Sequence, residues 1–390
     1  MKILPADGQG DGGPAAPAPE APFVARELRG GFDLFVVGTG AAGMAAAIRG
    51  AELGARVAIA ERGVLGGTCV NVGCIPSKAL IEAAERRHAC ARGHPGLGAC
   101  EPRVDWAALV ASKDALVSAL RREKYEEVLA SYPEITLLRG AARLVAGARA
   151  AAGDARAAAG GAGVAADGVR VAVDGVERRA RAVVLATGSS PALPPLPGLE
   201  RVDPLDSTSA MALAELPASL LVLGGGAVGL ELGQLFARLG TRVTVLEVLP
   251  RILAGEEPAV SEALRGFLEE EGVRIHTGVR VLAAERDRKD VVLRAHANGA
   301  AAEFRAERLL VAAGRRGNTH GLGLEEAGVE TDARGFVRVD AALRTTNPAV
   351  YAAGDVTGAP AFVYVAAAAG RLAAENALTG AGRALELRAV

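Results

Sequence analysis

A duplicated segment is the feature that most constrains the fold of this chain. Residues 32–62 read FDLFVVGTGAAGMAAAIRGAELGARVAIAER, and residues 219–248 read SLLVLGGGAVGLELGQLFARLGTRVTVLEV. When the two are superposed, their glycines coincide: Gly38 with Gly224, Gly40 with Gly226 and Gly43 with Gly229. Each copy has an apolar run typical of a strand, a G-x-G-x-x-G turn, a helical stretch and a second apolar run ending in Glu. The duplication predicts two βαβ units and therefore an α/β fold.

The spacing of these glycines also predicts a ligand class. The first glycine permits a tight turn, the second lets the backbone approach a pyrophosphate, and the third lets helix and strand pack closely. The pyrophosphate then lies at the positive N-terminus of the helix. The acid that ends each second run, Glu61 or Glu247, can bond a ribose diol. One such motif is weak evidence, but two complete copies indicate two dinucleotides, either both permanently bound or one bound and one that binds transiently.

The composition excludes several other classes of protein. The 390 residues include 44 basic and 45 acidic side chains, for a net charge of −1, which argues against a general nucleic-acid binder. No apolar run approaches the roughly 18 residues of a membrane helix. Four cysteines are too few for a disulfide-stapled secreted fold. Residues 1–30 read as a disordered leader without the apolar core of a signal peptide, so we expect a cytoplasmic protein.

Redox or nucleophilic chemistry is indicated in residues 66–80, GGTCVNVGCIPSKAL, which contain Cys69 and Cys74. Pro76 favours the first turn of a helix here, and thiols near a helix N-terminus have a lowered pKa. A regular helix would hold the two cysteines too far apart for a disulfide, so a disulfide requires a distorted turn between them, which Gly73 permits. No second Cys or His pair lies at zinc-ligand spacing, so we expect no metal site.

The remaining segments give a coarse secondary structure. Residues 104–131 predict a long helix whose charged stretch, residues 121–124, is a solvated face, and residues 135–184 predict an antiparallel meander with a flexible loop at 146–168. Cys90 and Cys100, near His88 and His94, are interpreted as structural or incidental. Further predictions are a Pro-rich crossing between domains at 191–198, a helix at 258–271, strands at 273–281, 291–295 and 308–311, and an Ala-rich helix within 341–390.

Taken together, the motifs resemble the flavoprotein disulfide reductases, the class I pyridine nucleotide-disulfide oxidoreductases. The resemblance extends from Phe32 to about Gly380 and rests on GTGAAG, GGTCVNVGCIPSK, ATG, GGGAVGLELG, AAGRRGNT and AAGDVTG. Residues 121–144 and 362–370 are most similar to mercuric reductases. The resemblance implies two Rossmann-like, three-layer domains, FAD in the first fingerprint, NADH or NADPH in the second, and a redox-active Cys69–Cys74 disulfide beside the flavin.

The resemblance also implies roles for individual residues. Cys74 would face the flavin and Cys69 would be the interchange thiol, while Lys78 would approach the flavin and pair with Glu231. Asp355 would hold the ribitol of FAD. The catalytic residues implied are Cys69, Cys74, Lys78 and Glu231. The cofactor-binding residues implied are Gly38, Gly40, Ala41, Ala42, Gly43, Glu61, Arg62, Gly67, Thr68, Lys78, Thr187, Gly188, Gly224, Gly226, Ala227, Val228, Gly229, Glu247, Gly314, Arg315, Gly354 and Asp355.

The expected organisation is a leader at 1–30, a discontinuous FAD-binding domain at 31–200 (with the redox disulfide and the meander) and 331–390, and an NAD(P)-binding domain at 201–330. The C-terminal dimerisation domain of the family, which would make a homodimer, is expected to be absent.

The implied activity is the FAD-dependent transfer of hydride from NAD(P)H to the disulfide, for reduction of Hg(II) to Hg(0). The alternatives are a dihydrolipoyl dehydrogenase or a catalytically incomplete FAD-binding fragment. Glu247 slightly favours NADH over NADPH, because a carboxylate repels a 2′-phosphate.

Overall fold

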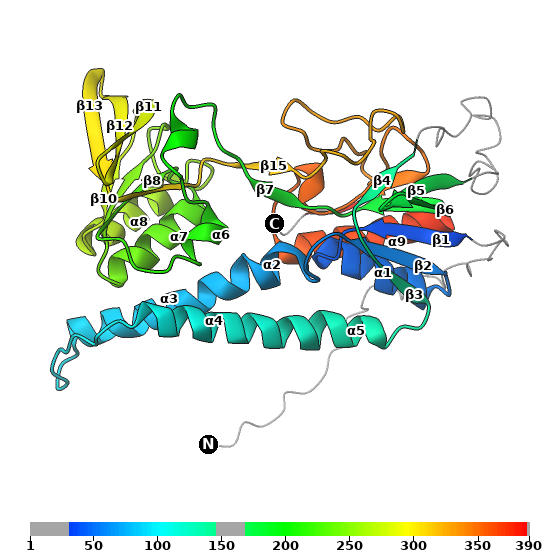
Figure 1. Ribbon diagram of the computed structural model, residues 1–390, viewed down its shortest axis with the longest axis horizontal. Coiled ribbons are helices and arrows are strands. Elements are labelled where there is room, and N and C mark those ends of the chain that lie inside the picture. Colours follow the sequence, from blue (N-terminus) through cyan, green and yellow to red (C-terminus); the bar gives the residue numbers. More distant parts are fainter. Residues whose placement is uncertain (1–30, 146–167, 388–390) are drawn as a thin grey trace, which may run out of the picture.

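The computed structural model describes residues 31–145 and 168–387 and shows two α/β bodies, bridged by long helices and by a pair of short strands (Figure 1). The predicted leader and nearly all of the predicted flexible loop lie outside the described residues. Among the helices of the described part, none is long and apolar enough to cross a membrane.

The first body is built on a seven-stranded sheet in the order β3-β2-β1-β6-β5-β4, with β16 also paired to β6. Strands β3, β2, β1, β6 and β16 run parallel, whereas β4 and β5 are antiparallel additions at the other edge. The strand bounds are β1 Phe32–Val37, β2 Val57–Glu61, β3 Ile135–Arg139, β4 Ala142–Leu144, β5 Val169–Val173, β6 Val176–Leu185 and β16 Val350–Ala352.

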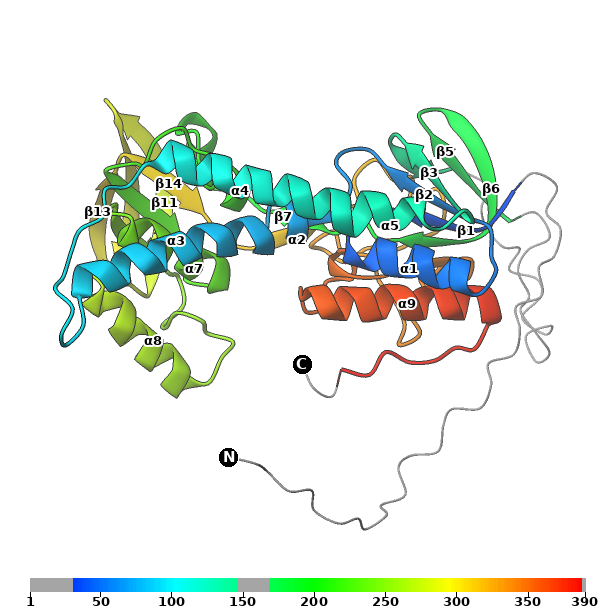
Figure 2. The same ribbon diagram turned by 90° about the horizontal axis from the view of Figure 1, so that it is seen from below.

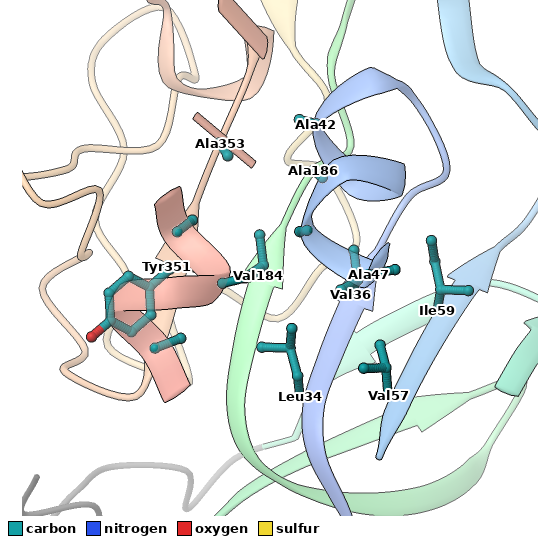
Figure 3. Close-up of a cluster of buried hydrophobic side chains, with 14 of the residues drawn as sticks. Leu34, Val36, Ala42, Ala47, Val57, Ile59, Val184, Ala186, Tyr351 and Ala353 are labelled. Atoms are coloured by element: carbon teal, nitrogen blue, oxygen red, sulfur yellow. The ribbon is translucent and has the colours of Figure 1, made fainter. Parts of the chain in front are cut away.

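Small side chains fill the core between this sheet and two helices, α1 (Ala41–Glu52) and α9 (Val363–Thr379). Figure 3 shows Val36 of β1 and Ile59 of β2 beside Ala47 of α1. The two helices approach so closely that a Cβ on Gly370 would lie 2.0 Å from the carbonyl oxygen of Ala42. A core of Ala, Val and Leu therefore packs densely although aromatic residues make up only 3% of the chain.

The second body contains a four-stranded parallel sheet, β10-β9-β8-β14, and a three-stranded antiparallel sheet, β11-β12-β13. Its helices are α6 Ser207–Ala210, α7 Ala227–Arg238 and α8 Pro258–Glu270, with a 3-10 turn, η2, at Leu199–Arg201. Its strands are β8 Ser219–Leu223, β9 Arg242–Leu246, β10 Arg274–His276, β11 Val279–Asp287, β12 Asp290–Ala297, β13 Ala300–Ala306 and β14 Arg308–Val311.

Two connections join the bodies. One is the antiparallel pair β7 (Ser189–Pro191) and β15 (Arg315–Gly317). The other is a helical hairpin, in which α3 (Cys74–Arg92) lies beside α4 (Trp106–Arg121) and both extend from the first body to the second (Figure 2). The far half of this hairpin packs on the second body: Leu80, Ala84 and Trp106 share one core cluster with Phe236 of α7. The short elements at the junction are α2 Gly67–Asn71 and η3 Asp355–Thr357.

The structure corrects three sequence predictions. Residues 135–139 are not part of the meander, because β3 pairs in parallel with β2 at the sheet edge. The predicted strand at 273–281 is divided between two sheets, since Gly278 takes a φ of +66° and turns the chain between β10 and β11. The long helix is interrupted by a π segment, η1 (Arg122–Glu126), before α5 (Glu127–Ala130). In the charged stretch, Arg122, Glu123 and Lys124 are exposed, as predicted, and Arg121 donates a hydrogen bond of 3.1 Å to Oδ1 of Asn71.

Candidate functional site

The two fingerprints fold into the same local geometry. The amide of Gly38 donates to the carbonyl of Ala60 at 2.9 Å, and the amide of Gly224 donates to the carbonyl of Leu246 at 2.9 Å. Both glycines have positive φ, 104° and 116°. A Cβ at either position would lie 2.5 Å from a backbone oxygen, that of Ala186 or of Ala312. These turns therefore need glycine both for their conformation and for the close approach of the neighbouring chain.

In the first copy, the carboxylate that ends β2 is held by the backbone of the fingerprint. Oε2 of Glu61 accepts hydrogen bonds from the amide (3.2 Å) and hydroxyl (2.6 Å) of Thr39, and Oε1 accepts one from the amide of Gly63 (2.8 Å). Thr39 was not among the predicted site residues, although it occupies the variable position of the fingerprint. The clamp fixes Glu61 at the mouth of the first nucleotide site.

The second copy repeats this clamp on Glu247. Its Oε2 accepts from the amide of Gly225 at 2.6 Å, and its Oε1 accepts from the amide of Leu249 at 2.8 Å. Only 9% of Glu247 is exposed. Arg251, the cation nearest in sequence, is turned away, since its Nη2 donates to the backbone carbonyls of Ala254 and Glu256 at 2.8 and 3.0 Å. The position that the sequence predicts for the ribose in the second copy therefore holds a clamped carboxylate.

Both fingerprint helices begin with open amides. The N-cap residues of α1 and α7 are Gly40 and Gly226, and neither has a side chain to bond the first N–H groups. Such unpaired amides, at the positive end of a helix dipole, form a binding site for pyrophosphate. The clamped acid and the uncapped helix together fit one dinucleotide in each copy.

A cavity of about 1090 Å³ opens in front of the first fingerprint. Of the predicted cofactor-binding residues, it is lined by Gly38, Gly40, Glu61, Arg62, Gly67, Thr68, Thr187 and Gly188. Its walls also include Arg316, Asn318, His320 and Arg334, which sequence reasoning did not single out. A cavity of this size, with arginines for phosphates and an acid for a ribose, fits FAD.

Ala42 and Asp355, which were also predicted to bind FAD, are not among the residues that line this cavity. Ala42 is 5% exposed and packs in the core of the first body. Asp355, in η3, accepts a hydrogen bond of 2.9 Å from the hydroxyl of Ser189, and Nε of Arg315 donates to the same hydroxyl at 2.7 Å. Ser189 thus links Asp355 to Arg315 across the junction of the two bodies.

Cys69 and Cys74, hereafter the redox pair, lie on two successive helices. Cys69 is in α2 and Cys74 is the first residue of α3, with the distorted turn that a disulfide would require between them. Gly73 caps α3 with φ −122° and ψ −111°, and a Cβ there would lie 3.0 Å from the carbonyl oxygen of Thr68. The structure presents the pair as two free thiols that hydrogen-bond to each other.

The environment makes Cys74 the thiolate of the pair. The hydrogen bond from the Cys69 thiol lowers the pKa of Cys74 to about 6, and the charge of Lys78 contributes in the same direction against the effect of burial. The same hydrogen bond raises the pKa of Cys69, and burial adds to this shift. The position of Cys74 at the N-terminus of a long helix also favours a thiolate. At neutral pH the pair therefore holds one proton, on Cys69.

Lys78 and Glu231 meet between the two bodies. Nζ of Lys78, one turn after Cys74 on α3, lies 2.6 Å from Oε1 of Glu231 on α7. Both side chains are about half exposed, at 57% and 44%, so this ion pair contributes little to stability. The ion pair instead fixes the position of the Lys78 ammonium group. It also sets the electrostatic potential at Cys74, because Lys78 lowers the pKa of that thiol and Glu231 raises it.

Tyr125 is a neighbour of the redox pair that sequence reasoning missed. It lies in the π segment η1, and its ring is 3.3 Å from the position of a Cβ on Gly66. Burial raises the pKa of the Tyr125 phenol, and the charges of Cys69 and Cys74 raise it further. π segments often mark functional sites, but nothing in the sequence pattern distinguishes this turn from a regular helix.

Comparison with known proteins agrees with the geometry. Residues 32–370 match the family model described as pyridine nucleotide-disulphide oxidoreductase. The chain belongs to this family. Its members use FAD and NAD(P)H, as the two nucleotide sites indicate. The fold of two Rossmann-like domains, which the resemblance implied, is thereby confirmed.

The relatives found by sequence include two kinds of named enzyme. A mercuric reductase of Streptomyces lividans is 46% identical over 362 residues, which are 92% of this chain and 73% of the relative. One of Staphylococcus aureus is 40% identical over 93% of this chain and 62% of the relative. A dihydrolipoyl dehydrogenase of Thermus scotoductus is 41% identical over 89% and 70%. The chain therefore spans about two thirds of the length of these relatives.

A solved structure shares the fold. The HOCl-induced flavoprotein disulfide reductase RclA from Escherichia coli superposes with a TM-score of 0.74 at 29% identity, covering 90% of this chain and 72% of that one. Both comparisons thus identify an oxidoreductase of the flavoprotein disulfide reductase class, and the resemblance to mercuric reductases is supported.

Proposed function

We propose that this protein uses NADH and FAD to reduce Hg(II) to Hg(0) at the redox pair. The observation that carries the proposal is the position of the pair, with Cys69 in α2 and Cys74 at the N-terminus of α3, one turn before Lys78. The lowered pKa of Cys74 and the raised pKa of Cys69 agree with it. Thr68, Asn71 and Val72, the residues around the pair, line the cavity that fits FAD. This proximity supports an exchange of electrons between the pair and a flavin bound in the cavity.

Thiolates match a soft cation such as Hg(II), in contrast to oxygen ligands. Binding of Hg(II) by Cys69 and Cys74 forms two Hg–S bonds and releases the proton of Cys69, because Cys74 already lacks one. The net reaction, Hg(II) + NADH → Hg(0) + NAD⁺ + H⁺, moves one electron pair. FAD, when bound, carries that pair from nicotinamide to the reacting centre. The chain's own residues hold the thiolate, fix the ribose-binding acids and position the helix N-termini.

NADH is the proposed electron donor. The carboxylate of Glu247 is buried and clamped at the position that the fingerprint predicts for the ribose of the second nucleotide, and it would repel a 2′-phosphate. Arg251, a cation that could attract a 2′-phosphate, donates through its Nη2 to carbonyls of its own loop. Steady-state kinetics with each nucleotide test the assignment. The value of kcat/KM for NADH should exceed that for NADPH, and in E247Q the two values should become more nearly equal.

The identity of the substrate is tested by parallel assays. NADH oxidation that depends on HgCl₂ and releases volatile mercury supports the proposal, provided that C69A and C74A abolish it while retaining FAD. The matched control is E285Q, at an exposed carboxylate of the antiparallel sheet. The second candidate is a dihydrolipoyl dehydrogenase, favoured by the Thermus relative. Reduction of NAD⁺ by dihydrolipoamide without mercury-dependent NADH oxidation would select it, and failure of both assays would overturn both.

A further inference from the structure

A second pair of thiols lies at the far tip of the helical hairpin. Cys90 is in the last turn of α3, and Cys100 follows the loop after that helix. The amide of Cys100 donates to the carbonyl of Cys90 at 2.9 Å, which brings the two residues side by side. A tight bridge between His94 and Leu97 closes the intervening loop. The sequence analysis interpreted these cysteines as structural or incidental, and the fold brings them together.

This second thiol pair is separate from the redox pair. Cys90 and Cys74 lie on the same unbroken helix, α3, and at about 1.5 Å per residue they are about 24 Å apart along its axis. The redox pair lies at the junction of the two bodies, whereas the second thiol pair lies at the opposite end of the hairpin. No electron transfer between the two pairs is needed for the chemistry that the second can perform.

Among the described residues, the donors that the fold brings together here are two sulfur atoms. Both cysteines are exposed, and their thiols hydrogen-bond to each other. Nδ1 of His94 is engaged at 2.9 Å from the carbonyl of Pro95, and Nε2 of His88 faces Glu271 at 3.8 Å. In residues 31–145 and 168–387, no group of three or more Cys, His, Asp and Glu side chains could hold a metal ion. This arrangement excludes a four-ligand zinc site and fits a soft cation that takes two thiolates.

We propose that Cys90 and Cys100 form a binding site for a thiophilic two-coordinate cation, with Hg(II) as the probe. An ion that arrives bound to two small thiols is transferred by ligand exchange: two Hg–S bonds to the carrier break, two to the protein form, and the protons of Cys90 and Cys100 pass to the departing thiols. No oxidant is consumed. A disulfide between the same residues would instead need a two-electron oxidant, and neither the structure nor the proposed reaction supplies one.

The fold favours capture by both sulfurs rather than one. Once the first thiol has exchanged, the second attack is intramolecular, and the hydrogen bond between the two backbones already holds Cys100 in place. The C-terminal end of α3 disfavours isolated negative charge, and the hydrogen bond with Cys90 raises the pKa of Cys100. A neutral bis-thiolate complex of a divalent ion avoids the charge that separate thiolates would place there.

The test measures retention of mercury by a variant that lacks the redox pair. FAD-loaded C69A/C74A protein is reduced with a phosphine, desalted without oxygen, mixed with HgCl₂ and excess free cysteine, and weighed by native mass spectrometry. We expect one mercury atom per chain and the loss of two protons. C69A/C74A/C90S and C69A/C74A/C100S should each lose this mercury, whereas C69A/C74A/H94A, which leaves both sulfurs in place, should retain it.

Several outcomes would overturn the proposal. They are absence of mercury from reduced C69A/C74A, retention by either cysteine-to-serine variant, or a Cys90–Cys100 disulfide that resists the phosphine. If C69A/C74A does not hold FAD, the intact chain is compared with C90S/C100S, and the expected count falls from two ions to one. The site does not depend on the reductase activity proposed above: C90S/C100S should keep mercury-dependent NADH oxidation, so the two proposals fail independently.

Discussion

The charge around Cys74 yields a prediction with a defined sign for each of three variants. In the intact pair the hydrogen bond from Cys69 is the largest cause of the lowered Cys74 pKa, Lys78 lowers it further, and Glu231 raises it. The direction in which the pKa of Cys74 shifts should therefore depend on which partner is replaced. C69A and K78M should raise the pKa of Cys74 above its value of about 6, and E231Q should lower it.

The magnitudes follow from the geometry. Cys74 and Lys78 are four residues apart on α3, so their side chains are about 6 Å apart. At that distance, unit charges interact by about 0.7 kcal/mol in water and about twice that if the effective dielectric is halved. Since Lys78 is 57% exposed, the lower value applies, and K78M should raise the pKa by about half a unit. Loss of the hydrogen bond in C69A, worth about 1.5–3 kcal/mol to a charged acceptor, should raise it by about one to two units.

The assay is the pH dependence of alkylation by iodoacetamide in fully reduced protein, with mass spectrometry to locate the label. A C90S/C100S background removes the other thiols, and retention of FAD shows that each variant is folded. The expected order of Cys74 pKa values is C69A highest, then K78M, then the parent, then E231Q. A K78M value at or below the parent, or an E231Q value above it, would refute the electrostatic argument.

Three further predictions concern other parts of the molecule. G67A should abolish FAD retention, measured as the ratio of flavin to protein, because Gly67 has φ +62° and its Cβ would lie 2.6 Å from Cα of Gly40; full occupancy would contradict this. Oxidation of the redox pair should lower the pKa of Tyr125, since it removes the neighbouring thiolate. The shift is measured by titrating the tyrosinate absorbance of the parent protein and subtracting the titration curve of Y125F. E375A should lower the free energy of unfolding by about 2 kcal/mol, because it removes the 2.7 Å partner of buried Arg49, which keeps its 3.2 Å ion pair with Glu52; an unchanged denaturation midpoint would refute it.

The sequence was sufficient for those parts of the fold that depend on local backbone requirements. Gly38 and Gly224 are demanded by a positive φ and by contact with a neighbouring strand, so the same residue types recur wherever that turn is built. The helix break between Cys69 and Cys74 follows from disulfide geometry in the same way. These features can be inferred from spacing because each is determined within a few residues.

Features that depend on distant pairing were not predictable from the sequence. The direction of β3 is set by its partner β2, across a helical hairpin, so its short apolar run is equally compatible with a meander. Tyr125 reaches the redox pair only because η1 adds a π turn to a helix that is otherwise regular in pattern. Arg334 lines the first nucleotide cavity from a segment with no motif of its own. In each case the decisive contact joins residues that are far apart in the chain.

The two copies of the fingerprint differ in one respect that bears on how each uses its nucleotide. In the first copy, α2 closes over the turn, so that a Cβ on Gly67 would collide with Gly40 and the cavity is walled on several sides. In the second copy, a Cβ on Gly226 would meet no described atom within 4 Å, and the adjacent Val228 is 44% exposed. A walled site retains a resident group, whereas an open one lets its occupant exchange. The same local motif can thus serve a bound flavin and a nicotinamide that must leave after each turnover.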